Sequence, residues 1–312
     1  MTDERKPLYH YYAPRYWLPW LGMLLLRAVC LLPHRVALGI GRFAGTLVFH
    51  TGRSRRAIVR RNIELCFPEM SAEDRETLTR DHFKALGMML IETGLGRWAS
   101  DRHIRSLLAD IKGLHHLTEV LDRGQGVIML CAHLTTLELS GRFIMNEIPP
   151  LDAVYRKNKS DFITEIQRTG RERAARQTIE KRDIKRMVRS LRQGHPVWYA
   201  PDQSFSRKGA EVIKFFGVPS MHTTATSTLA RLGRAAVIPF FPRRLPDNRY
   251  EVVILPPLDI PSGDPVYDTE QYANVLQEFV KSCPEQYFWI HRKFKDLPDG
   301  YPDYYAELDA LK

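Results

Sequence analysis

Short, uninterrupted apolar runs that alternate with amphipathic segments set the strongest limit on this fold. Residues 126–131 read Gly-Val-Ile-Met-Leu-Cys, which is typical of a strand buried on both faces of a parallel sheet. Further strands are predicted at residues 151–156, 196–200, 235–241 and 250–255. Helical spacing of apolar residues predicts helices at 134–147, 161–176, 182–193, 222–232, 269–281 and 284–294. This alternation predicts an α/β fold with a central, mostly parallel sheet flanked by helices.

The residues before this alternation predict a separate N-terminal region. Residues 17–32 and 36–49 are largely apolar, and the basic run 53–61 follows them. The first run carries Arg27 and is shorter than the roughly 20 residues that a bilayer span needs. Apolar helices followed by basic residues suit the anionic face of a membrane. We therefore expect residues 1–62 to attach the protein to a membrane, either as a helical anchor that spans it once or as helices in its interface; the alternative is two ordinary core helices.

A helix from residue 73 to 100, with Ser71 as its N-cap, is predicted to connect this region to the sheet. The 312 residues allow one large domain or two small ones, and no linker divides the chain after residue 100. We therefore expect membrane-attachment helices and a basic cluster at 1–62, followed by an α/β domain at 63–312.

The charge distribution predicts an anionic partner. The chain carries 46 basic and 36 acidic residues, with 11 basic and 2 acidic residues in 1–62 and 13 basic and 6 acidic in 151–200. Such concentrated charge suits nucleic acid, phospholipid head groups or a phosphorylated substrate, and the alternative is a solubilising surface. No helix-turn-helix, RNP or zinc-finger pattern is present, so no nucleic-acid partner is expected.

The four cysteines predict neither a disulfide framework nor a metal site. Cys30, Cys66, Cys131 and Cys283 are scattered and never form a CxxC pair. We expect them to be buried apolar residues in a reducing compartment.

The residues that point to chemistry follow the first apolar run. His133 leaves the carboxyl end of that predicted strand, where ligands bind in open α/β sheets. Thr135 or Thr136 is placed to cap a helix whose first turn holds Glu138. We expect the Glu138 carboxylate to fold back and orient the imidazole, which takes a proton from an alcohol as that alcohol attacks an acyl carbonyl. His133 and Glu138 are the predicted catalytic pair, and the alternative is a structural histidine at a strand end.

This stretch resembles the H-x4-D/E motif of glycerolipid-type acyltransferases. More specifically, the chain resembles the late (secondary) acyltransferases of lipid A biosynthesis, the lauroyl and myristoyl transferases. The matching segments, in order, are residues 61–69, the His133/Glu138 pair, 154–158, 170–171, 197–202, 240–244 and 284–295. The family often reads His-Phe-Gly-Asn-Trp-Glu where residues 133–138 read His-Leu-Thr-Thr-Leu-Glu, so contacts of the intervening loop are expected to differ.

The resemblance implies a bacterial inner-membrane enzyme that faces the cytoplasm, with residues 63–312 as its acyltransferase domain. It would move a fatty acyl chain from acyl carrier protein onto a hydroxyl of a hydroxyacyl chain on the lipid A precursor, Kdo2-lipid IV(A) or a close relative. The basic regions would then contact the acidic carrier protein, the phosphorylated precursor and inner-membrane phospholipid. No metal or dissociable cofactor is expected, because a thioester is already activated and the phosphopantetheine arrives as part of the donor.

Four further residues are predicted to belong to the site. Arg171 and Asp202 match family positions tied to activity: Arg171 would bind phosphate or stabilise developing negative charge, and Asp202 would orient a neighbouring arginine or the histidine. Arg156 and Arg243 lie at the ends of predicted strands and are candidates for binding substrate phosphate.

Other notable residues are given structural roles. Trp289 and His291 are expected in a packed C-terminal helix, and His222 at the surface or in a cap. Phe215 and Phe216 are expected in a turn packed on the core, with the wall of an acyl channel as the alternative.

Three rival functions remain open at this point. A lysophospholipid or glycerol-phosphate acyltransferase would share the histidine base and differ in its acceptor. A basic, non-catalytic lipid-binding protein of the membrane surface would explain the charge but not the His133/Glu138 pair, and a nucleic-acid-binding protein would explain the charge alone.

Overall fold

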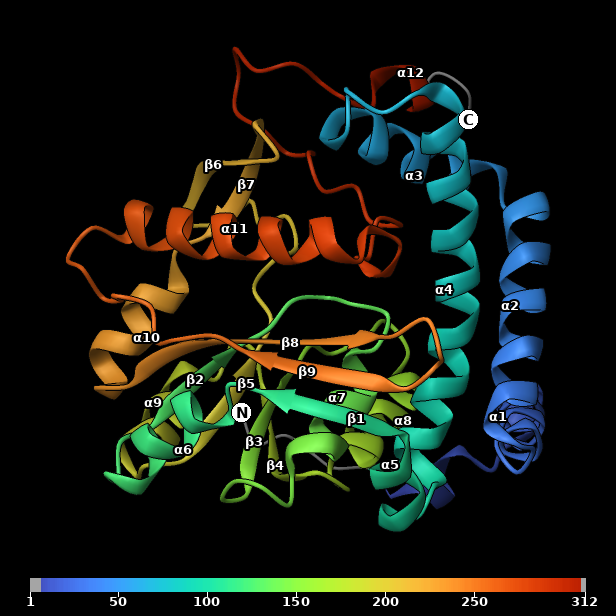
Figure 1. Cartoon of the computed structure of the whole chain (residues 1–312), viewed down its shortest axis with the longest axis horizontal. Helices are drawn as coiled ribbons and strands as arrows, with labels where there is room; N and C mark the ends of the chain where they lie inside the picture. The colour runs from blue at the N-terminus through green and yellow to red at the C-terminus, as the bar shows by residue number, and fades with distance from the viewer. Residues whose placement is uncertain (1–6, 310–312) are drawn as a thin grey trace.

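A seven-stranded sheet in the order β1-β9-β8-β2-β5-β3-β4 runs through the middle of the protein (Figure 1). The computed structural model describes residues 7–309. Neighbouring strands are parallel at every pairing except β8 with β9. The strands are β1 (Leu108–Lys112), β2 (Val127–Leu130), β3 (Leu151–Tyr155), β4 (Ala175–Glu180), β5 (Pro196–Tyr199), β8 (Ala236–Arg244) and β9 (Tyr250–Ile254). The predicted α/β fold with a mostly parallel central sheet is confirmed.

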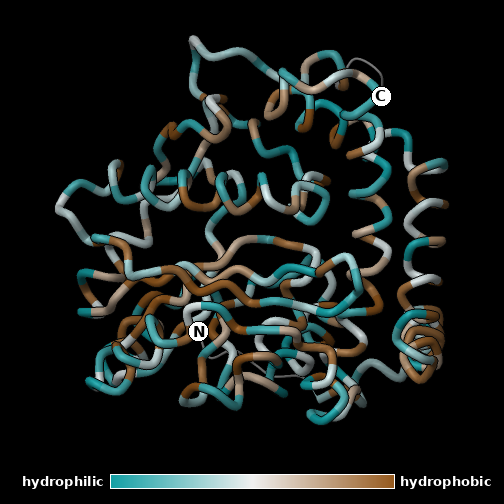
Figure 2. The backbone as a smooth tube through the Cα atoms, viewed as in Figure 1, coloured by the Kyte–Doolittle hydropathy of each residue, from teal (hydrophilic) through white to brown (hydrophobic). Residues whose placement is uncertain are grey.

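The central strand β2 is buried on both faces, as its uninterrupted apolar run predicts. Val127 and Met129 join the hydrophobic core on one face, whereas Ile128 and Leu130 join the core on the other. Hydrophobic residues accordingly concentrate along the strands of the sheet (Figure 2). Full burial of each of these side chains stabilises the folded protein by about 1.5–3 kcal/mol relative to leaving the side chain exposed.

Helices connect and cover the strands of this sheet. They are α5 (Asp101–Leu107), α6 (Leu114–Asp122), α7 (Leu137–Ile144), α8 (Asp161–Arg171), α9 (Ile184–Arg192), α10 (Ala225–Gly233), α11 (Pro265–Ser282) and the short α12 (Ala306–Asp309). The predicted helix 161–176 is too long, because the chain leaves α8 at Arg171 and starts β4 at Ala175. Strands β1 and β4 lie at the two edges of the sheet. The residues of β1 are half-buried or exposed, and β4 mixes buried, half-buried and exposed residues, so neither shows the continuous apolar run that identifies the inner strands.

The predicted helix at 284–294 is wrong. Only a 3-10 turn, η3 (Pro284–Gln286), forms there, and the chain then pairs with the loop that follows β2 through an isolated bridge between Leu134 and Tyr287. Trp289 is fully buried and its indole nitrogen donates to the carbonyl oxygen of Pro284 at 2.7 Å. Burial of this ring, with backbone hydrogen bonds to the neighbouring loop, outweighs the helical spacing of the sequence.

A small antiparallel hairpin, β6 (Ala210–Phe215) and β7 (Val218–Thr223), lies near α11 on one side of the sheet (Figure 1). Phe216 and Gly217 form its two-residue turn with φ of +53° and +74°, a left-handed conformation that glycine adopts without strain. Phe215 is fully buried, and the Phe216 ring lies 6.2 Å from that of Trp289. The interpretation of this segment as a turn packed on the core is confirmed.

The N-terminal helices pack against the long helix α4. They are the 3-10 helices η1 (Leu8–Tyr11) and η2 (Pro14–Tyr16), then α1 (Trp17–Val29), α2 (His34–Thr51), α3 (Arg53–Cys66) and α4 (Ala72–Trp98). The Ser71 hydroxyl accepts from the Asp74 N–H at 3.1 Å, so the predicted N-cap of α4 is confirmed. Helix α2 lies alongside α4 (Figure 1), and a Cβ atom on Gly87 would overlap the carbonyl oxygen of Gly41. Glycine therefore permits the close approach of these two helices.

The outer face of these helices is apolar. Trp17, Leu18 and Leu24 of α1 are 65, 79 and 63% exposed, and Phe43 of α2 is 73% exposed. Figure 2 shows the hydrophobic character of α1. Within residues 7–309, no helix is both long and apolar enough to cross a membrane, so the predicted single-spanning anchor is not supported.

Candidate functional site

Two neighbouring strands bring His133 and Asp202 together. Strands β2 and β5 are parallel and in register, with Leu130 opposite Tyr199. His133 stands three residues beyond the end of β2, and Asp202 stands three residues beyond the end of β5. Because the carboxyl ends of parallel strands meet at one edge of the sheet, the two side chains meet there.

The contact between them fixes the histidine. Oδ1 of Asp202 lies 2.6 Å from Nδ1 of His133 and also accepts from the His133 backbone N–H at 3.1 Å. The His133 carbonyl oxygen accepts from the Phe288 N–H at 3.0 Å. A carboxylate can only accept, so Nδ1 carries a proton, and in the neutral imidazole Nε2 keeps a free lone pair. This is the tautomer that a general base requires.

Asp202 is a buried anion, with 1% of its surface exposed. Burial raises the pKa of its carboxyl group, but the hydrogen bonds and charge of His133, together with the charge of Lys293, outweigh burial and hold the pKa at about 2. Asp202 is therefore ionised at neutral pH. The His133 side chain remains 32% exposed, so its free nitrogen can meet a substrate.

Glu138 has a different partner from the one its spacing predicts. The Arg171 guanidinium donates to it in a bidentate arrangement, through Nε at 3.0 Å and through a terminal nitrogen at 2.6 Å. The other terminal nitrogen donates to the Val154 carbonyl oxygen at 3.0 Å. The expectation that Glu138 orients His133 is therefore wrong in this structure: Asp202 holds the imidazole, and Glu138 holds Arg171.

Local structure explains this change of partner. Glu138 lies in the first turn of α7 as predicted, but the Thr136 hydroxyl donates to the Pro242 carbonyl oxygen at 3.0 Å instead of capping the helix. Arg171 is the last residue of α8, and its guanidinium lies over the Trp198 ring at 5.6 Å. The two side chains are 20 and 15% exposed, which makes this a largely desolvated ion pair rather than a solvated helix face.

The two phosphate candidates differ in their surroundings. The Arg243 guanidinium is held by Glu251, whose carboxylate also binds Lys112 at 2.6 Å. Arg156 directly follows β3 and is exposed. Of the two, Arg156 presents the more available charge.

A small recess lies beside His133 and Asp202. Its lining includes His133, Asp202, Tyr287, Phe288, His291 and Lys293. The site therefore consists of the ends of β2 and β5 together with the C-terminal segment that follows η3. Within residues 7–309, no cluster of three or more histidine, cysteine, aspartate or glutamate residues could hold a metal ion.

The family model of the bacterial lipid A biosynthesis acyltransferases matches residues 5–296. The chain belongs to this family. It is 38% identical to the lipid A biosynthesis lauroyltransferase of Escherichia coli, over 94% of this chain and 96% of that protein. It is 35% identical to a lipid A biosynthesis acyltransferase of Haemophilus influenzae, over 96 and 97% of the two chains. Identity to the lipid A biosynthesis palmitoleoyltransferase of Escherichia coli is also 35%, over 92 and 94%.

Among solved structures, the acyltransferase is similar to the 1-acyl-sn-glycerophosphate acyltransferase PlsC of Thermotoga maritima. The TM-score is 0.37 and the identity 15%, over 84% of this chain and 97% of that chain, a similarity too low to support a conclusion. The family match confirms the resemblance drawn from the motifs, and it gives no support to the nucleic-acid-binding or non-catalytic alternatives.

Sequence reasoning missed three polar residues of this acyltransferase site. Lys293 and His222 are buried and in contact with each other, and Tyr287 lines the recess. His222 lies in β7 with 1% exposure, so its expected place at the surface or in a cap is wrong. For Tyr287 and Lys293 the available signal is the matching segment 284–295, whose helical spacing predicts a packed helix and not a part of the site.

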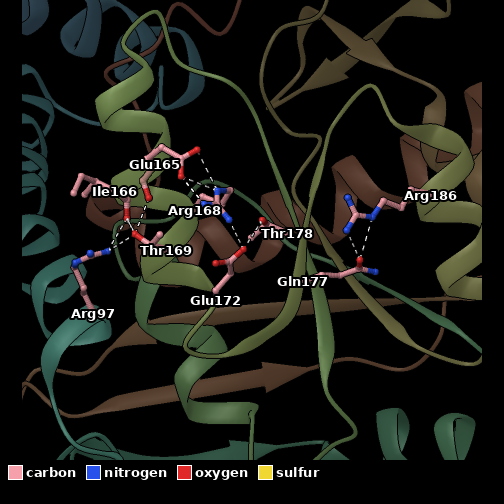
Figure 3. Close-up of polar contacts among 9 residues, drawn as sticks. All are labelled: Arg97, Glu165, Ile166, Arg168, Thr169, Glu172, Gln177, Thr178 and Arg186. Atoms are coloured by element: carbon pink, nitrogen blue, oxygen red, sulfur yellow. Dashed lines mark hydrogen bonds and ion pairs between the residues drawn. The ribbon is translucent and has the colours of Figure 1, made fainter. Parts of the chain in front are cut away.

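Part of the positive charge in the basic region 151–200 of the acyltransferase is paired inside the protein. Figure 3 shows Arg168 between Glu165 and Glu172, with the Glu172 contact at 2.6 Å. Arg176 pairs with the buried Asp152 in the same way. These pairs use acidic residues of the same region, which still holds 13 basic and 6 acidic residues. Exposed residues such as Arg156 present the remaining positive charge.

Arg97 holds the C-terminal part of α8 against α4. Arg97 of α4 donates to the Ile166 carbonyl oxygen at 2.9 Å and to the Thr169 hydroxyl at 2.8 Å (Figure 3). Arg171, which binds Glu138, therefore extends from a helix end that is anchored to α4.

Proposed function

We propose that this acyltransferase moves a fatty acyl chain from the thioester of acyl carrier protein to a hydroxyl group on a lipid A precursor. The acceptor would be a hydroxyacyl chain of Kdo2-lipid IV(A) or a close relative. The observation that carries the proposal is the His133–Asp202 contact at 2.6 Å, which leaves one imidazole nitrogen free at an open recess in a member of the lipid A acyltransferase family.

The proposed reaction is a direct transfer between two bound substrates. Nε2 of His133 takes the proton of the acceptor hydroxyl as its oxygen attacks the thioester carbonyl carbon. The ionised Asp202 stabilises the imidazolium that forms. When the tetrahedral intermediate collapses, the carbon–sulfur bond breaks and the imidazolium returns its proton to the leaving thiolate. The products are an ester and the free thiol of the carrier, so no metal or dissociable cofactor enters the balance.

We propose that Glu138 and Arg171 act as one unit beside this centre. Their bidentate contact joins the first turn of α7 to the last residue of α8. The pair would keep the loop from His133 to Glu138 in one conformation and place a charged surface next to the reacting groups. Arg171 is less suited to bind phosphate, because its nitrogens already donate to Glu138 and to Val154.

We propose that the enzyme attaches to the cytoplasmic face of the bacterial inner membrane through the outer face of α1 and α2. Leu18, Leu21 and Leu25 are 79, 50 and 59% exposed on α1. Apolar side chains on such a helix can enter the interface while basic residues contact anionic phospholipid. Attachment in the plane of the interface is consistent with the length of α1, which has 13 residues.

The test is mass spectrometry of lipid A from cells that lack this gene and from cells that regain it. We expect one acyl chain to be missing in the first and restored in the second, and no restoration by the His133→Ala variant at equal protein level. Purified enzyme should acylate the lipid A precursor from acyl carrier protein. Activity on a lysophospholipid or glycerol phosphate, with none on the precursor, would show that the acceptor is wrong.

A further inference from the structure

A buried cation, Lys293, contacts the histidine–aspartate pair, and the reaction proposed above gives it no role. Nζ of Lys293 donates to the backbone carbonyl oxygen of Asp202 at 2.5 Å and to Nε2 of His222 at 3.2 Å. Lys293 is 4% exposed. Burying an ammonium group is unfavourable unless the group is paired, so this contact requires an explanation.

The groups around Lys293 favour its protonated form. Asp202 supplies the negative charge, the Phe215 ring lies 5.1 Å away, and the Cys66 thiol is also near. Burial lowers the pKa of Lys293, Asp202 opposes that effect, and the result is about 8. Lys293 is therefore mainly protonated at neutral pH.

His222 is a neutral acceptor for the ammonium group of Lys293. Burial, with the positive charge of Lys293, lowers its pKa well below the usual value. An ammonium group only donates, so Nε2 of His222 is its acceptor in this contact. The Ser220 hydroxyl lies 2.8 Å from the same nitrogen, which limits the movement of the ring.

We propose that Lys293 is a positioning residue for the His133–Asp202 pair, and that His222 holds its ammonium group in place. Lys293 fixes the backbone of Asp202, so that the carboxylate faces the imidazole, and it keeps a positive charge behind that carboxylate. This inference rests on the proposed function, since it assigns a role relative to the proposed base.

The charge has a consequence for proton transfer. Asp202 attracts the proton that His133 takes from the acceptor, and the nearby Lys293 cation weakens that attraction. The imidazolium can then return its proton to the leaving thiolate. Without the cation, Asp202 would attract that proton more strongly, and the orientation of Asp202 would be less well defined.

The test compares Lys293→Met, which keeps the length and removes the charge, with Lys295→Met. Lys295 is the matched control, because it lies on the same segment with 48% of its side chain exposed. We expect Lys293→Met to lower kcat by about 10–100-fold, as when a residue that orients a metal-binding histidine is removed. KM for both substrates should change little, and the acid limb of the kcat/KM profile should move to higher pH. Lys295→Met should resemble the wild type in all three.

A second pair of variants tests the same role if Lys293→Met fails to fold. His222→Gln keeps an acceptor for the ammonium group, whereas His222→Leu removes it. We expect His222→Leu to reproduce the kcat loss and the moved acid limb, and His222→Gln to retain most of the activity. A folded Lys293→Met enzyme with unchanged kcat and acid limb would overturn the positioning role. So would a raised KM at constant kcat, because that result places Lys293 in contact with substrate.

A spectroscopic measurement separates this inference from the proposed reaction. The His133 imidazole can be titrated by NMR, with His133→Ala used to assign its signal, whether or not the enzyme turns over. A titration that moves to higher pH in Lys293→Met supports the positioning role, and an unmoved titration contradicts it. Full activity of His133→Ala would instead contradict the proposed base and leave the titration result standing.

Discussion

Asp202 accepts two hydrogen bonds from His133 through one oxygen, from the ring Nδ1 at 2.6 Å and from the backbone N–H at 3.1 Å. The contact fixes both the orientation of the ring and the position of the main chain that carries it. Asp202 is therefore the residue that sets the geometry of the proposed base.

The first prediction concerns this contact. His133→Ala should lower turnover by about 10²–10⁴-fold, because it removes the general base. Asp202→Ala should lose a similar amount, and the double variant should be little worse, because residues that act as a unit are not additive. Steady-state rates on the purified enzyme measure this, with the exposed His115→Ala as control. Independent, additive losses would show that the two residues do not work together.

The second prediction concerns stability in acid. The pKa of Asp202 falls from 3.8 to about 2 on folding, so its contribution is fully present above pH 3.8 and is lost as the pH falls through 2. At 1.36 kcal/mol per pH unit, this contribution is roughly 2 kcal/mol of unfolding free energy. Urea unfolding of the wild type and Asp202→Asn from pH 5 to pH 2 should show a steeper loss for the wild type. Parallel curves would contradict the ionised, paired state of Asp202.

The third prediction concerns Glu138 and Arg171. Removing either partner leaves the other charge largely buried, so Glu138→Ala and Arg171→Ala should each lower the unfolding free energy by about 3 kcal/mol. Arg171→Lys should recover little, because a lysine cannot form the bidentate contact. Thermal and urea unfolding measure the effect, and a double-mutant cycle gives the coupling energy. The exposed Arg173→Ala is the control, and no coupling between Glu138 and Arg171 would contradict their role as a unit.

The fourth prediction concerns phosphate recognition. Arg156→Ala should raise the acceptor KM and leave kcat nearly intact, the pattern of lost uniform binding. The penalty should largely vanish on a dephosphorylated acceptor. Arg171→Ala should keep its penalty on both acceptors, because that guanidinium binds within the protein. Because Glu251 holds the Arg243 guanidinium, Arg243→Ala should have little effect on KM. Normal kinetics of Arg156→Ala would exclude it as a phosphate ligand.

The fifth prediction concerns membrane attachment. Washing membranes in about 1 M salt should release little protein, because salt screens charge but not apolar burial. Detergent should release it. Replacing Leu18, Leu21 and Leu25 by glutamine should increase the fraction released by salt without changing the unfolding temperature, since all three are at least half exposed. Complete release of the wild type by salt alone would contradict attachment through the apolar face of α1.

The sequence predicts inner elements more successfully than edge elements. Strand β2 and its neighbours are buried on both faces, so an apolar run identifies them. The same reasoning does not find the edge strands β1 and β4, because a half-exposed strand has no continuous apolar run. It also predicts a helix where only the 3-10 turn Pro284–Gln286 forms, because burial of Trp289 overrides helical spacing.

The sequence by itself determined the α/β alternation, the position of His133 at a strand end and the presence of Glu138 in the next helical turn. Only the tertiary structure decided which carboxylate meets the imidazole. Strand order places β5 beside β2, which brings in Asp202 from 69 residues away, while α7 directs Glu138 to Arg171. Spacing along a chain constrains only local partners, whereas contacts at a sheet edge depend on the order in which distant strands pair.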